Sequence, residues 1–294
     1  MLTNHLCRGG ERLQRIKKAA TAHLNNFLKY RFLIRELVSK NIKLQYRNSF
    51  LGVLWTFLQP LLTMIVLAFV FNNIFGRDSS KVVNYPVYLL CGRLLYQFYT
   101  SSTKRAMGSV RKHASMIKKV YVPKYVYPVS AVLSAFVTFL ISLTVLVVVV
   151  AFMNIFKIHP IAVTWRVVFI IVPIFITLIL SIGVGMILAT ISVFFKDVEN
   201  LYDVFTLLLF YMTPIVYHVS RLGFEEGTWQ IRLLKLNPLY GLVGMFRAAV
   251  LWGTDFVHYW DMRLMYYSLG FAVVTVIIGF FLFYKYQDKF ILHI

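Results

Sequence analysis

Acidic residues are scarce in this sequence, which has 11 Asp and Glu against 31 Lys and Arg in 294 positions. No acid occurs between Asp78 and Asp197, and the long apolar runs contain none at all. Carriers driven by protons or sodium place ionisable residues inside their spans, because a charge there is costly and is kept for function. The shortage of acids therefore argues against a secondary transporter.

The residues that build metal, redox and nucleotide sites are also missing. The two cysteines, Cys7 and Cys91, lie far apart, and the seven histidines form no HxxxH or HExxH pair. There is no GxSxG nucleophile elbow and no GxxxxGK[ST] phosphate loop. We expect no metal and no cofactor in this chain, and it cannot hydrolyse ATP in the P-loop manner by itself.

What the sequence has in abundance is apolar side chains. Hydrophobic residues fill 59% of the positions, 14% are charged, and the mean hydropathy is +0.71. This composition lies outside the range of soluble globular domains and indicates a membrane protein. The net charge of +20 comes from basic residues between apolar runs, a placement typical of topology signals and lipid headgroup contacts. Nucleic acid is therefore not the expected partner.

Six runs have the length or composition of transmembrane helices, since a bilayer core about 30 Å thick needs about 20 apolar residues in a helix. Five runs are free of charge, and the second is interrupted by Arg93, Lys104 and Arg105. The sequence predicts an all-α integral membrane protein with six transmembrane helices. They are expected at Val53–Phe75, Tyr85–Val110, Tyr127–Phe156, Val167–Phe195, Val204–Val219 and Leu264–Tyr284.

The loops give this bundle an orientation, because cytoplasmic loops hold the excess of Lys and Arg. Residues 1–50 carry eleven basic residues against Glu11 and Glu36, and the stretch from Lys104 to Lys124 carries seven with no acid. The loops around residues 77–81 and 157–166 are sparsely basic. We expect a multi-pass protein of the plasma membrane with both termini in the cytoplasm.

An amphipathic helix is expected before the first span. At 100° per residue, an apolar arc that includes Phe27, Ile34 and Leu37 opposes an arc with Lys40 and Lys43. This pattern is typical of a helix lying in the membrane surface, and a helix packed on a soluble partner remains an alternative. The chain thus divides into residues 1–50, a cytoplasmic tail with this interfacial helix, and residues 51–294, the six-helix transmembrane domain.

The stretch between the fifth and sixth spans is too long for a turn and too interrupted to cross the bilayer. Leu236–Phe246 and Ala248–Trp252 are short apolar pieces on either side of Arg247, and Pro238 stands near the start. We expect short re-entrant or interfacial helices on the outer side. In the fourth span, Gly183 and Gly185 are expected to allow close helix packing rather than to bind a nucleotide.

Five ordered stretches resemble one family. The segment from Leu37 to Leu62, LVSKNIKLQYRNSFLGVLWTFLQPLL, closely resembles the start of type-two ABC exporter permeases, where an interfacial helix leads into the first span. Asn41 stands where such permeases often have Asp, so an ion pair there is not expected. The further similar stretches, in order, are IKKVYVPKYVYP at Ile117–Pro128, VFFKDVENL at Val193–Leu201, YMTPIVY at Tyr211–Tyr217 and LNPLYGLVGMFRAAVLWG at Leu236–Gly253.

The resemblance is strongest to permeases that export lipid-linked O-antigen and other polysaccharides or teichoic acids. It implies a bacterial homodimer that binds two copies of a separate ATPase, which would hold ATP and Mg. The substrate class that it implies is an undecaprenyl-diphosphate-linked polymer. Two rivals remain open: a membrane enzyme that transfers or polymerises lipid-linked sugars, and a drug or small-lipid exporter permease of the same superfamily.

Three groups of residues are candidates for this function. Basic residues near the membrane surface would receive the diphosphate, since Arg pairs bidentately with phosphate: Arg31, Arg35, Lys43 and Arg47. Aromatic faces would let sugar rings slide without fixing one hydrogen-bond pattern: Trp55, Phe57, Tyr96, Phe98 and Tyr99. A short basic helix at Val110–Tyr121 and the proline after it would contact the ATPase: Arg111, Lys112, Lys118, Lys119, Tyr121 and Pro123. Ordinary positive-inside charge and helix packing are the alternatives for all three groups.

Overall fold

The computed structural model describes residues 30–47, 49–74, 84–119, 122–157, 160–161, 164–217, 228–251 and 260–293. Within these ranges the regular structure is helical and contains no strand, which confirms the all-α prediction. Three helical stretches are long and apolar enough to cross a membrane: Val126–Ile155, Trp165–Phe194 and Met262–Lys289.

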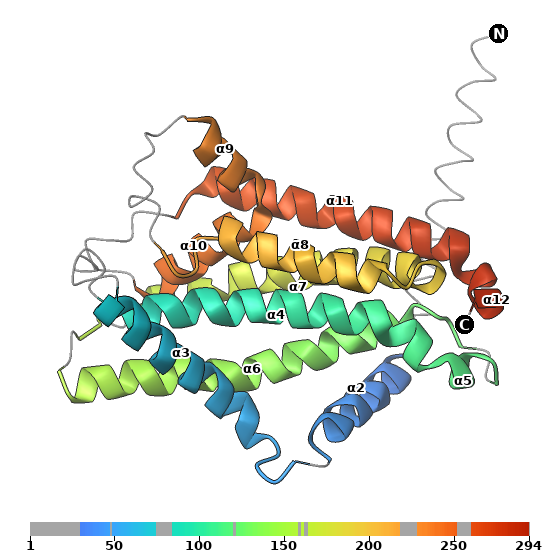
Figure 1. Cartoon of the computed structure of the whole chain (residues 1–294), viewed down its shortest axis with the longest axis horizontal. Helices are drawn as coiled ribbons and strands as arrows, with labels where there is room; N and C mark the ends of the chain where they lie inside the picture. Colours follow the sequence, from blue (N-terminus) through green and yellow to red (C-terminus); the bar gives the residue numbers. More distant parts are fainter. Residues whose placement is uncertain are drawn as a thin grey trace.

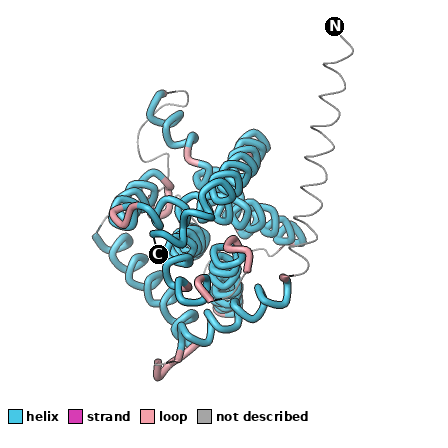
Figure 2. Tube along the Cα trace, turned by 90° about the vertical axis from the view of Figure 1, so that its right-hand side faces the viewer, coloured by secondary structure: helices cyan, strands magenta, loops and turns pink. Residues whose placement is uncertain are grey.

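Most of the long helices run roughly along one axis, successive ones in opposite directions, and α3 (Leu54–Ile74) crosses them at an angle (Figure 1). Figure 2 shows the same bundle from one end. α4 (Tyr85–Lys112) is central, because it packs against α3, α6 (Val126–Ile155), α7 (Ile171–Phe194) and α10 (Pro238–Val250). Asn84 precedes α4, and Pro86 stands in its first turn, where a missing N–H costs nothing. These helices are α3 (Leu54–Ile74), α4 (Tyr85–Lys112), α6 (Val126–Ile155), α7 (Ile171–Phe194) with the 3-10 turn η2 (Trp165–Ile170) before it, α8 (Val198–Met212) and α11 (Met262–Tyr286).

The predicted amphipathic helix is α2 (Arg31–Tyr46). Ile34 and Leu37 are buried in a cluster with side chains of α6, α7 and α11. The described core of the apolar arc is therefore covered by the protein's own bundle, whereas Phe27 lies outside the described residues. Between α2 and α3 the chain turns at Gly52, whose φ of +50° lies in the left-handed region that favours glycine.

Two helices meet at glycines. A Cβ on Gly183 of α7 would lie 2.6 Å from the backbone nitrogen of Val276 in α11, and a Cβ on Gly279 of α11 would lie 2.6 Å from the carbonyl oxygen of Gly183. Gly185 likewise faces Ala106 of α4, 2.8 Å from its Cβ. The expected packing role of Gly183 and Gly185 is confirmed, since small residues let helix backbones approach closely.

The fifth apolar run does not form the helix predicted at Val204–Val219. α8 begins six residues earlier, at Val198, and ends at Met212, because Pro214 lacks an N–H and disfavours helical backbone in the residue before it. Thr213 is accordingly extended. Glu199 and Asp203, which precede the predicted span, lie in the first turns of α8.

The backbone after α8 is irregular, yet side chains from two other helices satisfy its carbonyl groups. Arg247 of α10 donates from Nη1 to Pro214 O at 2.6 Å and from Nη2 to Ile215 O at 2.8 Å. The hydroxyls of Tyr85 and Tyr88 in α4 donate to the carbonyl oxygens of Val216 and Tyr217 at 2.8 and 3.1 Å. Four consecutive carbonyls thus have partners, as buried non-helical backbone requires.

Residues 228–251 contain two short helices, as expected, but the break between the helices does not lie at Arg247. α9 (Trp229–Leu236) and α10 (Pro238–Val250) meet at Asn237, whose side chain accepts from Leu239 N at 3.0 Å and caps α10. α10 continues through Arg247 without a break, so the predicted division there is wrong. The apolar wall of α10 explains this, because Phe246, Ala248 and Ala249 are fully buried around the arginine.

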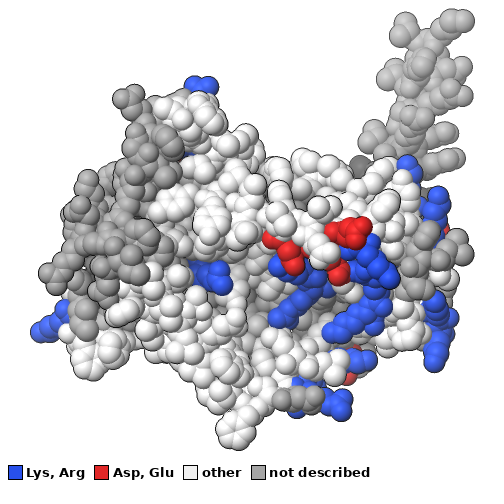
Figure 3. All heavy atoms as spheres, in the orientation of Figure 1, with Lys and Arg blue, Asp and Glu red and all other residues white. Residues whose placement is uncertain are grey.

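One end of the bundle, here named the basic end, is where α4 and α11 finish and α6 and α8 begin. It also carries α2, the short helix α5 (Ala114–Ile117), the 3-10 turn η4 (Gln287–Lys289) and α12 (Phe290–His293). Figure 3 shows Lys and Arg gathered toward this end, with acidic atoms among them. Lys124 Nζ donates to Gln287 O at 2.6 Å, and the Phe290 ring is buried against Phe194 and Phe283.

Candidate functional site

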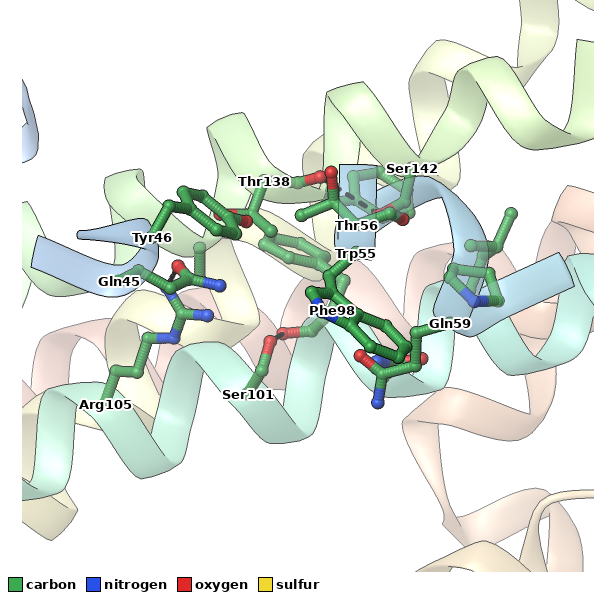
Figure 4. A pocket seen from close by; sticks show the side chains of 15 residues that line it. Gln45, Tyr46, Trp55, Thr56, Gln59, Phe98, Ser101, Arg105, Thr138 and Ser142 are labelled. Atoms are coloured by element: carbon green, nitrogen blue, oxygen red, sulfur yellow. Dashed lines mark hydrogen bonds between the residues drawn. The ribbon is translucent and has the colours of Figure 1, made fainter. Parts of the chain in front are cut away.

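A small cavity lies between α3, α4, α6 and the end of α2, and we name it the α3–α4 cavity. Its volume is about 100 Å³. Trp55 and Phe98 supply aromatic surface, while amide, hydroxyl and guanidinium groups supply polar surface (Figure 4). The lining residues are Gln45, Tyr46, Trp55, Thr56, Gln59, Pro60, Leu94, Gln97, Phe98, Ser101, Arg105, Ala135, Thr138, Phe139 and Ser142.

Hydroxyl groups occur at every fourth position along one face of α6, and two of them, Thr138 and Ser142, line this cavity. Residues four apart share one helix face, so Ser130, Ser134, Thr138 and Ser142 form one row. Ser142 Oγ also donates to Thr56 O of α3 at 3.1 Å. Asn41 of α2 donates from Nδ2 to Ser134 Oγ at 3.3 Å, which shows what this amide contacts in place of an ion pair. The row of hydroxyls thus ties α2 and α3 to α6.

A second hollow, the α2–α4 groove, adjoins the cavity toward the basic end. Its volume is about 410 Å³. The two spaces share Gln45 and Arg105, and Arg105 donates from Nη1 to Gln45 Oε1 at 2.9 Å (Figure 4). This hydrogen bond therefore lies at the boundary between them. The groove is lined by Asn41, Leu44, Gln45, Lys104, Arg105, Gly108, Ser109, Lys112, His113, Ala131 and Ser134.

Two ion pairs join α4 to the first turns of α8. Lys104 Nζ lies 2.6 Å from Asp203 Oδ1, and Arg111 pairs with Glu199. Residues 104 and 111 are two turns apart on α4, and residues 199 and 203 are one turn apart on α8, so the antiparallel helices bring both pairs together. Both lysine and aspartate of the first pair are substantially exposed, which makes its contribution to stability small.

His113 closes the groove at the end of α4. Its ring is buried, its Nδ1 is 2.8 Å from Ser109 O, and it stacks on Tyr127 at 4.9 Å between centroids. Burial lowers the pKa of His113, the nearby Lys112 and Lys40 lower it further, and the hydrogen bond to Ser109 opposes them. The imidazole is therefore neutral near pH 7, and the charge of this region comes from Lys and Arg.

The structure places the predicted headgroup residues on the surface of α2 and at its end. They are exposed, and none lines the cavity or the groove: Arg31, Arg35, Lys43 and Arg47. Their interaction with a diphosphate stays a prediction.

The predicted aromatic residues fall into two groups. Trp55 and Phe98 line the α3–α4 cavity, and Phe57 packs partly buried against the core. Tyr96 and Tyr99 are buried between α4 and α8, where the Tyr96 hydroxyl donates to Thr206 O. Within one protomer these two tyrosines support helix packing, and their contact with sugar stays a prediction.

The predicted ATPase-contacting segment is not one helix. α4 extends to Lys112, the chain turns at His113, and α5 is a single turn. Lys112, Lys118 and Lys119 are exposed, Arg111 is engaged by Glu199, and Pro123 is partly buried. Tyr121 lies outside the described residues. The separation arises because His113 leaves helical geometry, with φ of −105° and ψ of 18°.

Arg105, Gln45 and Asp203 are site residues that sequence reasoning missed. In the sequence Arg105 stands out only as an interruption of an apolar run, and Asp203 directly precedes the predicted fifth span. The scarcity of acids in the sequence could have identified Asp203, because the few acids available are expected to form ion pairs with the basic stretch at 104–124. No comparable signal marks Gln45.

A sequence profile of ABC-2 type transporters matches residues 33–251. The chain belongs to the ABC-2 type transporter family. It is 28% identical over 259 residues to the O-antigen export system permease protein RfbA of Klebsiella pneumoniae, covering 88% of this chain and 93% of that protein.

Two further relatives of this ABC-2 transporter chain are a second O-antigen export permease and a polysialic acid transport protein. The RfbA permease of Myxococcus xanthus is 30% identical over 220 residues, which cover 74% of this chain and 80% of that protein. The polysialic acid transport protein KpsM of Escherichia coli is 22% identical over 254 residues, 84% of this chain and 90% of that protein. The resemblance found in the sequence is confirmed. The chain is a multi-pass membrane permease that works with an ATPase subunit, and it is not an enzyme.

Proposed function

We propose that this ABC-2 permease exports a lipid-linked polysaccharide of O-antigen or capsule type across the plasma membrane of a bacterium. The observation that carries the proposal is the similarity to two O-antigen export permeases over most of both chains. Those names favour polysaccharide over teichoic acid. An undecaprenyl-diphosphate-linked polymer is the substrate class that we expect.

We propose six spans, formed by α3, α4, α6, α7, α8 and α11, with both termini in the cytoplasm. The concentration of Lys and Arg at the basic end supports this orientation. α8 has 15 residues and is about 22 Å long at 1.5 Å per residue, which is less than the bilayer core. The satisfied carbonyls of residues 214–217 and the short helices α9 and α10 would complete that span on the outer side.

The proposed assembly is a homodimer of this chain with two copies of a separate ATPase, which binds ATP and Mg. Large apolar side chains of α8 remain exposed on the protomer, including Leu201, Val204 and Leu208, and they suit a second copy or lipid. The exposed Lys118 and Lys119, with the neighbouring Tyr121 and Pro123, would meet the ATPase at the basic end.

The experiment that tests the function is depletion of this chain in cells whose lipid-linked glycan can be extracted and sized. We expect full-length glycan on its lipid carrier to accumulate inside the cells, and re-expression to restore it at the surface. Loss of polymer synthesis would indicate a transferase or polymerase instead. Normal surface glycan with altered drug or lipid efflux would indicate the small-molecule exporter.

A further inference from the structure

The α2–α4 groove gathers basic side chains and has no acid in its lining. Of its three basic residues, Lys104 pairs with Asp203. Among the described residues, Arg105 and Lys112 form no ion pair with a carboxylate. Two positive charges in one hollow are therefore without a counter-charge from the described part of this protomer.

Arg105 is partly buried and has donors to spare. Its hydrogen bond to Gln45 is the one that its guanidinium makes within the described residues. A guanidinium carries five N–H donors in a fixed fork. Charge-assisted hydrogen bonds are shorter and about twice as strong as neutral ones, so an anionic oxygen would compete well with the neutral Gln45 amide. The geometry thus favours an anion with two or more acceptor oxygens.

The groove also has an apolar side. Leu44 of α2 is 43% exposed at its edge, and Ala131 of α6 lines it. A free anion gains nothing from an exposed leucine, whereas a lipid places its apolar chain beside its charged group. The volume of about 410 Å³ is sufficient for a phosphate group with some of its water, since a water molecule occupies about 30 Å³ of liquid.

We propose that the α2–α4 groove binds the phosphate group of a membrane lipid, with Arg105 and Lys112 as cationic contacts and Leu44 against the lipid's apolar part. Two sources share this chemistry: a polyprenyl-diphosphate-linked substrate and an anionic phospholipid. The first source rests on the proposed function, whereas the second does not. Because Gln45 and Arg105 also line the α3–α4 cavity, a bound phosphate lies at the boundary between the two spaces.

Gly108 provides a way to fill the groove without disturbing the helix. It lines the groove, and no heavy atom lies within 4 Å of a Cβ built on it. Gly108→Ala is therefore a matched control for Gly108→Phe, whose ring would occupy the groove. Arg105→Gln removes the charge but keeps an amide, and Arg263→Gln removes an exposed charge from the start of α11 as its control.

The experiment uses the full chain with its ATPase in phosphatidylcholine nanodiscs. Binding is titrated with three probes: undecaprenyl diphosphate, phosphatidylglycerol and inorganic pyrophosphate. We expect Arg105→Gln and Gly108→Phe to weaken lipid binding by about tenfold or more, as loss of a charge-assisted contact predicts. Gly108→Ala should stay within about twofold, because a methyl group fits there without contact and leaves the groove open. Arg263→Gln should also stay within about twofold, because an exposed charge contributes little. The lipid that binds more tightly and displaces the other identifies the source.

Three results would overturn the proposal. The first is equal lipid affinity in all four variants, provided that each purifies as the intact complex. The second is pyrophosphate binding as tight as that of either lipid, which would show that the apolar wall is not used. The third is loss of the ATPase from Arg105→Gln and Gly108→Phe with lipid binding unchanged, which would assign the groove to an acidic side chain of the partner. All three readouts are independent of glycan export, so they stand even if the proposed function fails.

Discussion

The guanidinium carbon of Arg247 lies 3.5 Å from the centre of the Tyr88 ring, and Arg247 Nε donates to the carbonyl oxygen of Tyr88 at 3.1 Å. α10 and α4 are thereby joined through one side chain that is 5% exposed. Space for it exists because Gly92 lacks a side chain: a Cβ there would lie 2.4 Å from Arg247 Nη2. The same guanidinium also satisfies the carbonyls after α8.

Replacing Arg247 with Met should destabilise the permease, because it leaves three carbonyl oxygens without this donor. An unsatisfied buried group costs about 1–3 kcal/mol. Arg247→Lys should recover only part of the loss, since one ammonium cannot present the planar fork. Thermal unfolding of the purified chain measures this, with Arg263→Met as the exposed control. Equal melting temperatures for both Met variants would show that the hydrogen bonds of Arg247 to these carbonyl oxygens do not stabilise the permease.

Gly279→Ala should destabilise the contact between α7 and α11, because the added methyl meets the carbonyl oxygen of Gly183 at 2.6 Å. Gly270, on the same helix, has no heavy atom within 4 Å of a built Cβ. Gly270→Ala is thus the matched control and should be neutral or stabilising by up to about 1 kcal/mol, the usual helix-propensity gain. The comparison is made by unfolding in detergent, and similar losses in both variants would refute the packing role.

Lys104→Asp and Asp203→Lys should each lower stability slightly, and the double exchange should restore it. Because the pair is exposed, we expect a coupling energy of about 0.2–1 kcal/mol. The effect should shrink as salt is raised, since exposed charges are screened. A double-mutant cycle at low and high salt measures it. A double exchange that is additive at low salt would show that the two side chains do not interact.

Charge reversal at Lys118 and Lys119 together should reduce the stimulation of the partner ATPase without unfolding the permease. Both residues are exposed at the basic end, directly after α5, so their side chains are not part of the buried core. ATP hydrolysis by the reconstituted complex is the measurement, with Arg232, exposed on α9, reversed as control. Stimulation that survives the double reversal would remove these lysines from the coupling surface.

His113 should make the permease less stable as the pH falls. Burial lowers its pKa in the folded state below the ordinary value of 6.5, so the unfolded chain takes up the proton first. Above pH 6.5 the ring is mostly neutral in both states, so it does not change the free energy of unfolding. As the pH drops below this value, protonation of the unfolded chain lowers that free energy. His113→Gln should flatten the difference in melting temperature between pH 7.5 and pH 5.5. An unchanged difference would show that the ring does not titrate with folding.

Helices that depend on uninterrupted apolar runs were predictable from sequence. The run at Tyr127–Phe156 and the helix at Val126–Ile155 differ by one residue at each end, because an uninterrupted apolar run of bilayer length leaves little choice. The end of α8 was predicted too late, since an apolar run alone does not reveal that Pro214 stops the helix. Local backbone chemistry overrides hydropathy there.

The groove was beyond sequence reasoning for a different reason. Gln45 and Arg105 are 60 residues apart, and their contact depends on how α2 crosses α4. The basic residues that stand out in the sequence, such as Arg31 and Arg35, are exposed and line neither hollow. Arg105 was hidden within a mixed apolar run. Charge counting predicts the end of a bundle where cations gather, but helix crossing decides which of them line a space.

The glycine contact between α7 and α11 makes these two helices a single mechanical unit. With Gly183 and Gly279 back to back, an axial slip of either helix would drive Thr275 or Met186 into the other backbone. We therefore expect α7 and α11 to move together in a transport cycle. An exposed ion pair such as Lys104–Asp203 can be broken at little cost, whereas this backbone contact cannot slide without a steric clash.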